Sequence, residues 1–515
     1  MAKPRHPERN GAPQSLDVPE GWALAPLSKL LALMESGGRP KGGVRHISEG
    51  VPSIGGEHLD SNGGFRLERV KFVPDSFYKT MRHGHIAIGD VLIVKDGATT
   101  GKVALVREDF PYKKAVVNEH VFICRPAAPL RADFLFWFLF SQQGQNEILS
   151  NFQGSAQGGI NQTFAANTFI PVAPLPEQKR IVAKIDALTA HVDAARERLA
   201  KVPAILKRFR QSVLAAACSG RLTGDWRELH PDIDPASQLL KNISVDCRRK
   251  TESQLEDDLP ELPETWAWSR FAILIGELRN GISTKPNIDP PGTKILRINS
   301  VRPGAVIFDD VRFLPDSEHL LSTYRLREGD LLFTRYNGSL DLLGVCGMVR
   351  HLPKEPVLYP DKLMRVRFDH AYVVPAYVEI FFQSRHARDR LTARSKSSAG
   401  QQGVSGADIK AQFVALPPVE EQREIVRRVE ALFKVADAIE KRVAMATARA
   451  EKLTQSILAE AFRGELVPTE ADLARREGLE YESACDLLTR IRSDGASKTV
   501  RKEERKGRAP DALLS

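Results

Sequence analysis

The chain has few cysteines and no long hydrophobic run. Its five cysteines are scattered without a Cys-x-x-Cys pair: Cys124, Cys218, Cys247, Cys346 and Cys485. This pattern predicts neither a disulfide framework nor a zinc site, and it favours a reducing compartment. The polar first residues, MAKPRHPERNG, predict no signal peptide because they lack an apolar core. The most apolar run, FLFWFLF at 134–140, is far shorter than the ~20 residues that span a bilayer, so it predicts a buried helix. We therefore expect a cytoplasmic protein without a membrane partner.

Complete catalytic motifs are also lacking. The sequence DPPG at 289–292 lacks the aromatic residue that an amino-methyltransferase would stack on a flipped base. The sequence GATTGKV at 97–103 is one residue shorter than a phosphate-binding loop and has Val103 where that loop needs a hydroxyl group. His83 and His85 could share one face of a strand, but no third metal ligand accompanies them. We expect no catalytic residue, no metal site and no cofactor in this chain.

Length and charge leave several classes open. A chain of 515 residues is too long for one ordinary domain and predicts two to four. Its 74 lysines and arginines exceed its 65 aspartates and glutamates by nine. This excess fits a polyanionic partner such as a nucleic acid, although many soluble proteins are mildly basic.

The chain repeats itself at an offset of about 244 residues. Such repeats are sought first, because missing them leads to the wrong fold. Most similarity lies at the two ends of each copy, and the roughly 150 residues between these ends differ. The repeated pairs are PEGW (19–22) and PETW (263–266), IGDVLI (88–93) and EGDLLF (328–333), Glu177-Gln178 and Glu421-Gln422, QSVL (211–214) and QSIL (455–458), Gly220 and Gly464, and PASQLL (235–240) and SACDLL (483–488).

Each copy closes with a segment whose apolar residues alternate in steps of four and three. This spacing predicts a helix with a heptad seam, and the two seams are best buried against each other. The alternative is that each helix packs only on its own domain. Pro203 predicts a kink in the first helix. The expected seam consists of Ile181, Ile185, Leu188, Val192, Ala195, Leu199, Val202, Leu206, Phe209 and Val213, and of Ile425, Val429, Leu432, Ala436, Ile439, Val443, Ala446, Ala450, Leu453 and Ile457.

The differing regions are rich in short β-branched runs between Gly, Asn and Asp residues, which predict strands. Each region then continues with an apolar helix-like stretch and a loop rich in Gly, Gln and Ser, GSAQGGINQ (154–162) or SSAGQQGVS (397–405). Such a loop suits a close approach of the backbone to a ligand, and a flexible connection fits it equally well.

These motifs resemble those of the specificity subunits of type I restriction–modification systems. The resemblance rests on the Glu-Gln and Ile-Val helix starts, on FRQSVLAAACSGRL (209–222) and LTQSILAEAFRGELV (453–467), and on Pro-Glu-x-Trp at each start. It implies an α+β chain in which two β-rich target-recognition domains form a pseudo-two-fold repeat, joined by two long helices in an antiparallel coiled coil. The implied segments are a flexible N-terminal tail (1–16), recognition domain 1 (17–172), helical spacer 1 (173–223), a linker (224–260), recognition domain 2 (261–415), helical spacer 2 (416–466), and a C-terminal segment with a basic tail (467–515).

The resemblance also implies the partners. Each recognition domain would read one half of a split site in double-stranded DNA. Two modification subunits would carry out methyl transfer, and restriction subunits would join them. S-adenosylmethionine, ATP and Mg²⁺ would then belong to those partners, and this subunit would not itself be an enzyme.

Candidate DNA contacts lie on Gly-rich loops of both differing regions. Forked donors and amides read bases, and lysines and arginines position phosphates. The candidates are Arg39, Lys41, Arg45, Lys95, Thr99, Thr100 and Lys102 in the first region, and Lys285, Asn287, Arg297, Asn299, Arg335, Tyr336 and Asn337 in the second.

Two other functions remain open at this stage. A coiled-coil scaffold whose β-rich domains bind protein or carbohydrate would share much of the pattern, and retention on random duplex DNA would distinguish it. A specificity subunit of a methylation-only or phage-exclusion system would have nearly the same physical design.

Overall fold

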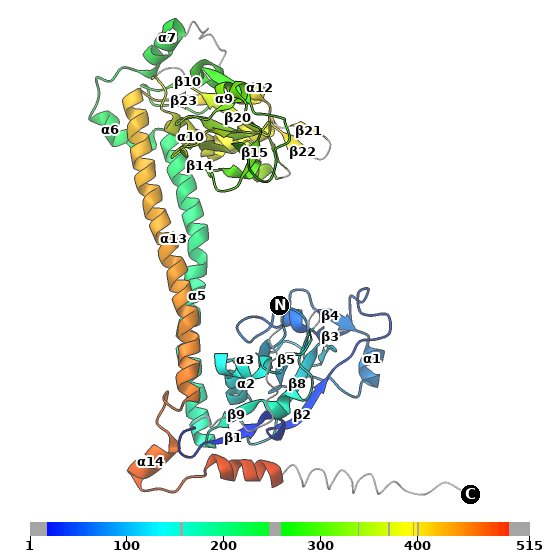
Figure 1. Cartoon of the computed structure of the whole chain (residues 1–515). Helices are drawn as coiled ribbons and strands as arrows, with labels where there is room; N and C mark the ends of the chain where they lie inside the picture. Colours follow the sequence, from blue (N-terminus) through cyan, green and yellow to red (C-terminus); the bar gives the residue numbers. More distant parts are fainter. Residues whose placement is uncertain are drawn as a thin grey trace. The chain divides into compact units, whose positions relative to one another are not determined.

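The computed structural model describes residues 18–154, 158–246, 259–337, 339–368, 371–394, 396–398 and 401–493 (Figure 1). The predicted N-terminal tail and the basic stretch at 497–510 lie outside these residues. The chain forms two compact units: unit 1 comprises Met1–Leu199 and Ala446–Ser515, and unit 2 comprises Ala200–Met445. Each unit therefore contains one β-rich domain together with part of each long helix. The segment boundaries drawn from the sequence stay predictions.

Unit 1 contains two main sheets. Its strands are β1 (Ala23–Pro26), β2 (Leu31–Ser36), β3 (Val51–Ile54), β4 (Lys71–Val73), β5 (Val91–Val94), β6 (Val103–Leu105), β7 (Val116–Val117), β8 (Val121–Pro126) and β9 (Phe169–Val172). The strand orders are β2-β8-β5-β6 and β4-β3-β7, and β1 pairs separately with β9. Its short helices are α1 (Asp75–Thr80), α2 (Ala132–Phe140), α3 (Gln142–Leu149), α4 (Phe164–Asn167) and α14 (Glu470–Glu477). Residues 484–493 are also helical.

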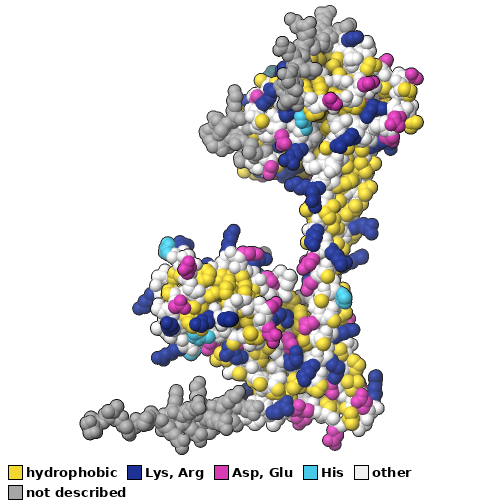
Figure 2. Space-filling view, turned by 180° about the vertical axis from the view of Figure 1, so that it is seen from behind, with side chains coloured by type: hydrophobic (Ala, Val, Ile, Leu, Met, Phe, Trp, Pro, Cys, Tyr) yellow, Lys and Arg dark blue, Asp and Glu magenta, His cyan; other side chains and the backbone are white. Residues whose placement is uncertain are grey.

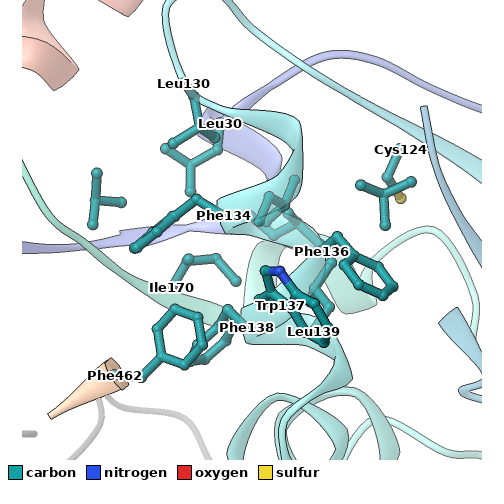
Figure 3. Close-up of a cluster of buried hydrophobic side chains, with 14 of the residues drawn as sticks. Leu30, Cys124, Leu130, Phe134, Phe136, Trp137, Phe138, Leu139, Ile170 and Phe462 are labelled. Carbon is teal, nitrogen blue, oxygen red and sulfur yellow. The ribbon is translucent and has the colours of Figure 1, made fainter. Parts of the chain in front are cut away.

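The core of unit 1 is built around α2. All residues from Phe134 to Leu139 are buried, so the predicted buried helix is confirmed. The helix lies against β5, β6 and β8. Figure 3 shows Phe462, from the end of the second long helix, beside Phe134 and Phe138, with ring centroids 5.3 and 5.1 Å apart. The domain core and the long helix therefore share one hydrophobic cluster.

Unit 2 repeats this arrangement. Its strands are β10 (Ala267–Arg270), β11 (Glu277–Asn280), β12 (Thr293–Leu296), β13 (Val301–Arg302), β14 (Ala305–Val306), β15 (Val311–Leu314), β16 (Leu331–Thr334), β17 (Tyr336–Asn337), β18 (Cys346–Met348), β19 (Val357–Leu358), β20 (Leu363–Arg367), β21 (Lys396–Ser398), β22 (Gln401–Gly403) and β23 (Phe413–Leu416). Its short helices are α6 (Gly224–Glu228), α7 (Ala236–Asp246), α8 (Phe271–Leu274), α9 (Glu318–Tyr324), α10 (Pro375–Gln383), α11 (Arg385–Ala393) and α12 (Gly406–Lys410). The orders β11-β20-β16-β18 and β15-β12-β19 match the two main sheets of unit 1, and β17-β22-β21 is an additional sheet.

The two long helices pack antiparallel in each unit. They are α5 (Leu175–Cys218) and α13 (Val419–Phe462), of 44 residues each. In unit 1 Arg196 Nη2 donates to Thr454 Oγ1 at 3.2 Å, and in unit 2 Arg210 Nη1 donates to Glu440 Oε1 at 2.8 Å. At the repeat offset of 244 residues, Arg196 corresponds to Glu440 and Arg210 corresponds to Thr454. The two contacts therefore join the same pair of repeat positions, with the two helices exchanged. The predicted antiparallel pair is confirmed, and α5 continues through Pro203. The kink stays a prediction.

The structure leaves three residues of the predicted seam exposed. Ile439 and Leu453 are 37% and 51% exposed, whereas Thr454, outside the predicted seam, is 7% exposed. A straight helix drifts ~20° per heptad from a repeat of 3.5 residues, so Leu453 has turned roughly 80° from Ile425. Ala195 is exposed as well. Of the other seventeen expected seam residues nine are buried: Ile181, Ile185, Val192, Leu206, Val213, Ile425, Val429, Ala436 and Ile457. The remaining eight are half-buried: Leu188, Leu199, Val202, Phe209, Leu432, Val443, Ala446 and Ala450.

Candidate nucleic-acid interface

The repeated Trp and Glu residues bond to each other in both units. Trp22 Nε1 donates to Glu177 Oε1 at 2.9 Å, and Trp266 Nε1 donates to Glu421 Oε2 at 2.8 Å. Both carboxylates are fully buried at the start of a long helix. The two motifs recur together because they fasten each β-rich domain to its helix.

Each buried carboxylate has further donors. The backbone N–H of Glu470 donates to Glu177 at 2.9 Å, and burial raises the pKa of Glu177 above its usual range. Glu421 accepts hydrogen bonds from Thr223 Oγ1 at 2.6 Å and from Arg227 Nη1. Glu177, at the start of α5, is therefore bonded by a residue that follows α13. Glu421, at the start of α13, is bonded by residues that follow α5.

The repeated glutamines hold the chain between domain and helix. Gln178 Nε2 donates to the carbonyl of Ala173 at 2.8 Å, and Gln422 Nε2 donates to that of Pro417 at 2.9 Å. Both glutamines are fully buried. The Glu-Gln repeat thus has a structural role and does not form a ligand-binding surface.

The Gly-Asp motifs anchor the central strands of the two domains. Asp90 binds the guanidinium of Arg125 with both oxygens, at 2.6 and 2.9 Å, and Asp330 binds Arg367 in the same way, at 2.7 and 2.6 Å. The glycines before these aspartates have φ values of 88° and 83°, which favour glycine. These pairs fix the starts of β5 and β16, whose other ends lead into the candidate contacts.

In unit 1 the end of β5 meets the second Gly-rich loop. The N–H of Lys95 donates to the carbonyl of His120 at 2.9 Å, and the carbonyl of Lys95 accepts from the N–H of Ile160 at 2.7 Å. A Cβ atom on Gly159 would lie 2.4 Å from that same carbonyl oxygen. This glycine permits a close approach to the chain's own backbone, so a ligand is not needed to explain it.

Unit 2 has the same backbone frame at the end of β16. The N–H of Arg335 donates to the carbonyl of Lys362 at 2.8 Å, and the carbonyl of Arg335 accepts from the N–H of Val404 at 2.9 Å. A Cβ atom on Gly403 would lie 2.7 Å from Cε1 of Tyr336. Lys95 and Arg335 therefore occupy equivalent positions, although the regions around them have little sequence in common.

The predicted contacts on the 95–102 loop of unit 1 point in different directions. The Lys95 amine lies 5.6 Å from the centre of the Phe122 ring. Lys102 Nζ donates to the carbonyl of Leu59 at 3.2 Å, and Thr100 Oγ1 donates to a carbonyl within its own turn. Lys95 is thus better placed than Lys102 for an external partner.

The remaining predicted contacts of unit 1 are mostly exposed. Lys41 and Arg45 are exposed, and Thr99 is half-buried. Arg39 forms an ion pair with Glu119, with Nε 3.0 Å from the carboxylate oxygen. Because Glu119 adjoins His120, this pair brings Arg39 close to the backbone frame of Lys95.

In unit 2 the predicted contacts come from several loops. Lys285, Asn287 and Asn299 are exposed. Arg297 Nη1 donates to Asp310 Oδ2 at 2.5 Å, so its guanidinium already has a carboxylate partner.

Arg335 and Tyr336 form a stack. The centre of the Arg335 guanidinium lies 4.8 Å from the centre of the Tyr336 ring. Asn337 pairs through its backbone with β22, and its side chain lies outside the described residues.

The sequence reasoning missed several charged residues beside this frame. His120 Nδ1 lies 2.5 Å from Asp96 Oδ1, and His120 Nε2 lies 3.3 Å from Glu119 Oε1. Lys362, the counterpart of His120, is exposed. Aligning the two copies of the sequence would not reveal that His120 and Lys362 are equivalent, because this equivalence follows from the strand that each of them precedes and pairs through.

The structure brings no three potential metal ligands together among the described residues. His83 Nδ1 lies 3.3 Å from Glu35 Oε2, and His85 Nε2 lies 3.2 Å from the carbonyl oxygen of Met81. None of the helices in the described part of the chain combines the length and hydropathy of a membrane span.

Comparisons with known proteins place the chain among DNA specificity proteins. A family model described as a type I restriction modification DNA specificity domain matches residues 19–204. The type I restriction enzyme EcoKI specificity subunit of Escherichia coli (strain K12) is 38% identical, over 95% of this chain and 98% of that protein. The StySPI specificity subunit of Salmonella potsdam is 30% identical, over 94% of this chain and 99% of that protein. A solved structure described in terms of complex assembly and conformational transition of the type I R-M system shares the fold, with a TM-score of 0.64 and 19% identity over 88% of this chain and 100% of the other.

Proposed function

The chain belongs to the type I restriction–modification specificity-subunit family, and we propose that each of its β-rich domains reads one half of a bipartite, asymmetric DNA site. The protein then selects the sequence on which a restriction–modification complex acts. It contributes no catalytic residue, metal or cofactor of its own.

One observation supports this function most directly: the two domains hold different side chains on the same backbone frame. Lys95 and His120 in unit 1 occupy the positions of Arg335 and Lys362 in unit 2. A shared frame allows both domains to approach DNA in the same way. Different side chains on it allow them to read different bases, because sequence is read by contacts to base edges.

The long helices are proposed to dock two modification subunits, which restriction subunits join. Val435 and Ile439, both on α13 in unit 2, are 56% and 37% exposed. Hydrophobic side chains are visible along the exposed faces of the long helices (Figure 2). Contiguous exposed apolar surface marks protein–protein contacts. Sites for S-adenosylmethionine, ATP and Mg²⁺ are assigned to these partners.

Domain replacement tests the proposal. The chain is expressed with its modification subunit, and the methylated sequence is identified by methylome sequencing of the host. Replacing residues 17–172 by those of another family member should change one half-site and leave the other half-site intact. A change of both half-sites together would contradict independent reading, and absence of sequence-specific methylation would contradict the function itself.

A further inference from the structure

The backbone and the side chain of Arg335 both have partners within unit 2. Its backbone N–H and carbonyl are both hydrogen-bonded, to Lys362 and Val404. Its guanidinium lies 4.8 Å from the Tyr336 ring centre. That ring in turn lies so close to Gly403 that a Cβ atom there would come within 2.7 Å of it. Gly403 thus lies against the edge of the Tyr336 ring, and the Arg335 guanidinium lies near the same ring at the end of β16.

Arg335 also differs from other arginines of unit 2 in its charge environment. Arg297, Arg350 and Arg367 each pair with an aspartate or glutamate. Within the described part of the chain Arg335 has no carboxylate partner, and the adjacent Lys362 is exposed and also unpaired. The five N–H donors of this guanidinium therefore remain available for an external acceptor. An unpaired guanidinium and an unpaired ammonium group at the ends of neighbouring strands together suit a polyanionic partner.

We propose that Arg335 reads a guanine in the half-site bound by unit 2, donating two N–H groups to O6 and N7 of that base in the major groove. This inference rests on the proposed function. A planar, forked donor beside an aromatic ring suits this bidentate pair, which is the commonest specific contact of arginine with DNA. The exposed Lys362 suits a neighbouring phosphate, since an ammonium group acts as a point charge.

Unit 1 lacks this device. At the positions of Arg335 and Tyr336 it has Lys95 and Asp96, and Asp96 lies against His120. Neither a fork nor a ring is present at those two positions. The two half-sites should therefore differ in their dependence on guanine, and the stack belongs to one recognition domain.

Base analogues test the contact in the complete complex with the modification subunits. The guanines of the unit 2 half-site are replaced one at a time by 7-deazaguanine, which removes the N7 acceptor and preserves Watson–Crick pairing. The wild-type complex should lose about 10-fold in affinity at one guanine. Arg335→Gln should bind the natural site about 10- to 100-fold less tightly and should be insensitive to the analogue at that guanine.

Further variants separate base reading from charge and from folding. Arg302→Gln removes the same charge from an exposed arginine of unit 2 and should keep the analogue sensitivity. Arg335→Lys keeps the charge without the planar fork, and it should bind the natural site less tightly while binding random DNA normally. Gly403→Ala should weaken discrimination by displacing the ring, and Tyr336→Phe should retain it.

Three outcomes would overturn the inference. If Arg335→Gln weakens all sequences equally and lowers the salt slope by about one, the guanidinium contacts a phosphate. If the variant remains as sensitive to the analogue as the wild type, another residue reads the guanine. If the unit 2 half-site contains no guanine, the assignment is wrong although the proposed function stands. A wild-type complex without any sequence preference would instead refute both.

Discussion

Replacing Glu421 by alanine removes a buried carboxylate on which three donors converge. Trp266 Nε1, Thr223 Oγ1 and Arg227 Nη1 all donate to it, and its exposed fraction is 0%. The substitution leaves a cation and two polar hydrogens without their acceptor. Breaking a buried ion pair from one side costs about 3–5 kcal/mol. Since each kcal/mol shifts the melting temperature of a domain this large by about 2–4 °C, unit 2 should melt roughly 6–20 °C lower.

The measurement is thermal unfolding followed by circular dichroism and calorimetry on the full chain. Glu420→Ala is the matched control, because Glu420 is the adjacent glutamate and is exposed. It should cost under about 1 kcal/mol, since only its charge near the positive end of the helix dipole is lost. Glu421→Gln keeps one acceptor oxygen and should fall between the two. If Glu421→Ala melted within about 2 °C of the control, the motif would not fasten the domain to its helix.

Other substitutions test the remaining parts of the structure. Leu453→Ala should lower the free energy of unfolding in urea by under about 1 kcal/mol, because the Leu453 side chain is 51% exposed. Ile457→Ala should lower it by about 2–5 kcal/mol, because Ile457 is only 6% exposed. Equal losses would show that both side chains are buried, as a strict heptad seam requires. A hydrogen bond from Arg427 lowers the pKa of Glu424 to about 2. Glu424→Gln should therefore destabilise the protein above about pH 4.5, and this difference in stability should shrink as the pH falls towards about 2. A difference in stability that does not depend on pH would contradict the ion pair. Lys95→Ala should lower the salt slope of DNA binding by about one, and an unchanged slope would place this amine away from phosphates.

The sequence predicted those features that local patterns encode. The residues of FLFWFLF were expected in a buried helix, and Phe134 to Leu139 are buried. The spacing of Ile181, Ile185 and their repeats predicted two long helices that pack together, because helical periodicity is a property of neighbouring residues. Its limit appears at Leu453, where a strict heptad and the 3.6 residues per turn of a straight helix diverge.

The role of the repeated motifs became visible only in the folded structure. The Glu-Gln recurrence is visible in the sequence, but its bonds are not: Trp22 lies 155 residues from Glu177. The Gly-Asp recurrence is likewise visible in the sequence, but its partner is not: Arg125, on another strand, binds Asp90.

The sequence by itself determined that this protein has two copies of one design, with repeated helical ends and differing β-rich regions. It also determined the family, because the motifs that identify it lie in contiguous stretches. Only the tertiary structure decided which side chains lie together at each candidate interface. Lys95, His120 and Ile160 come from three separate segments, and they meet because β8 pairs beside β5 and the later loop crosses the end of both. Strand order is a non-local property, and no local pattern could have distinguished Lys102, which turns to the carbonyl of Leu59, from Arg335, which remains free of any carboxylate in the described chain.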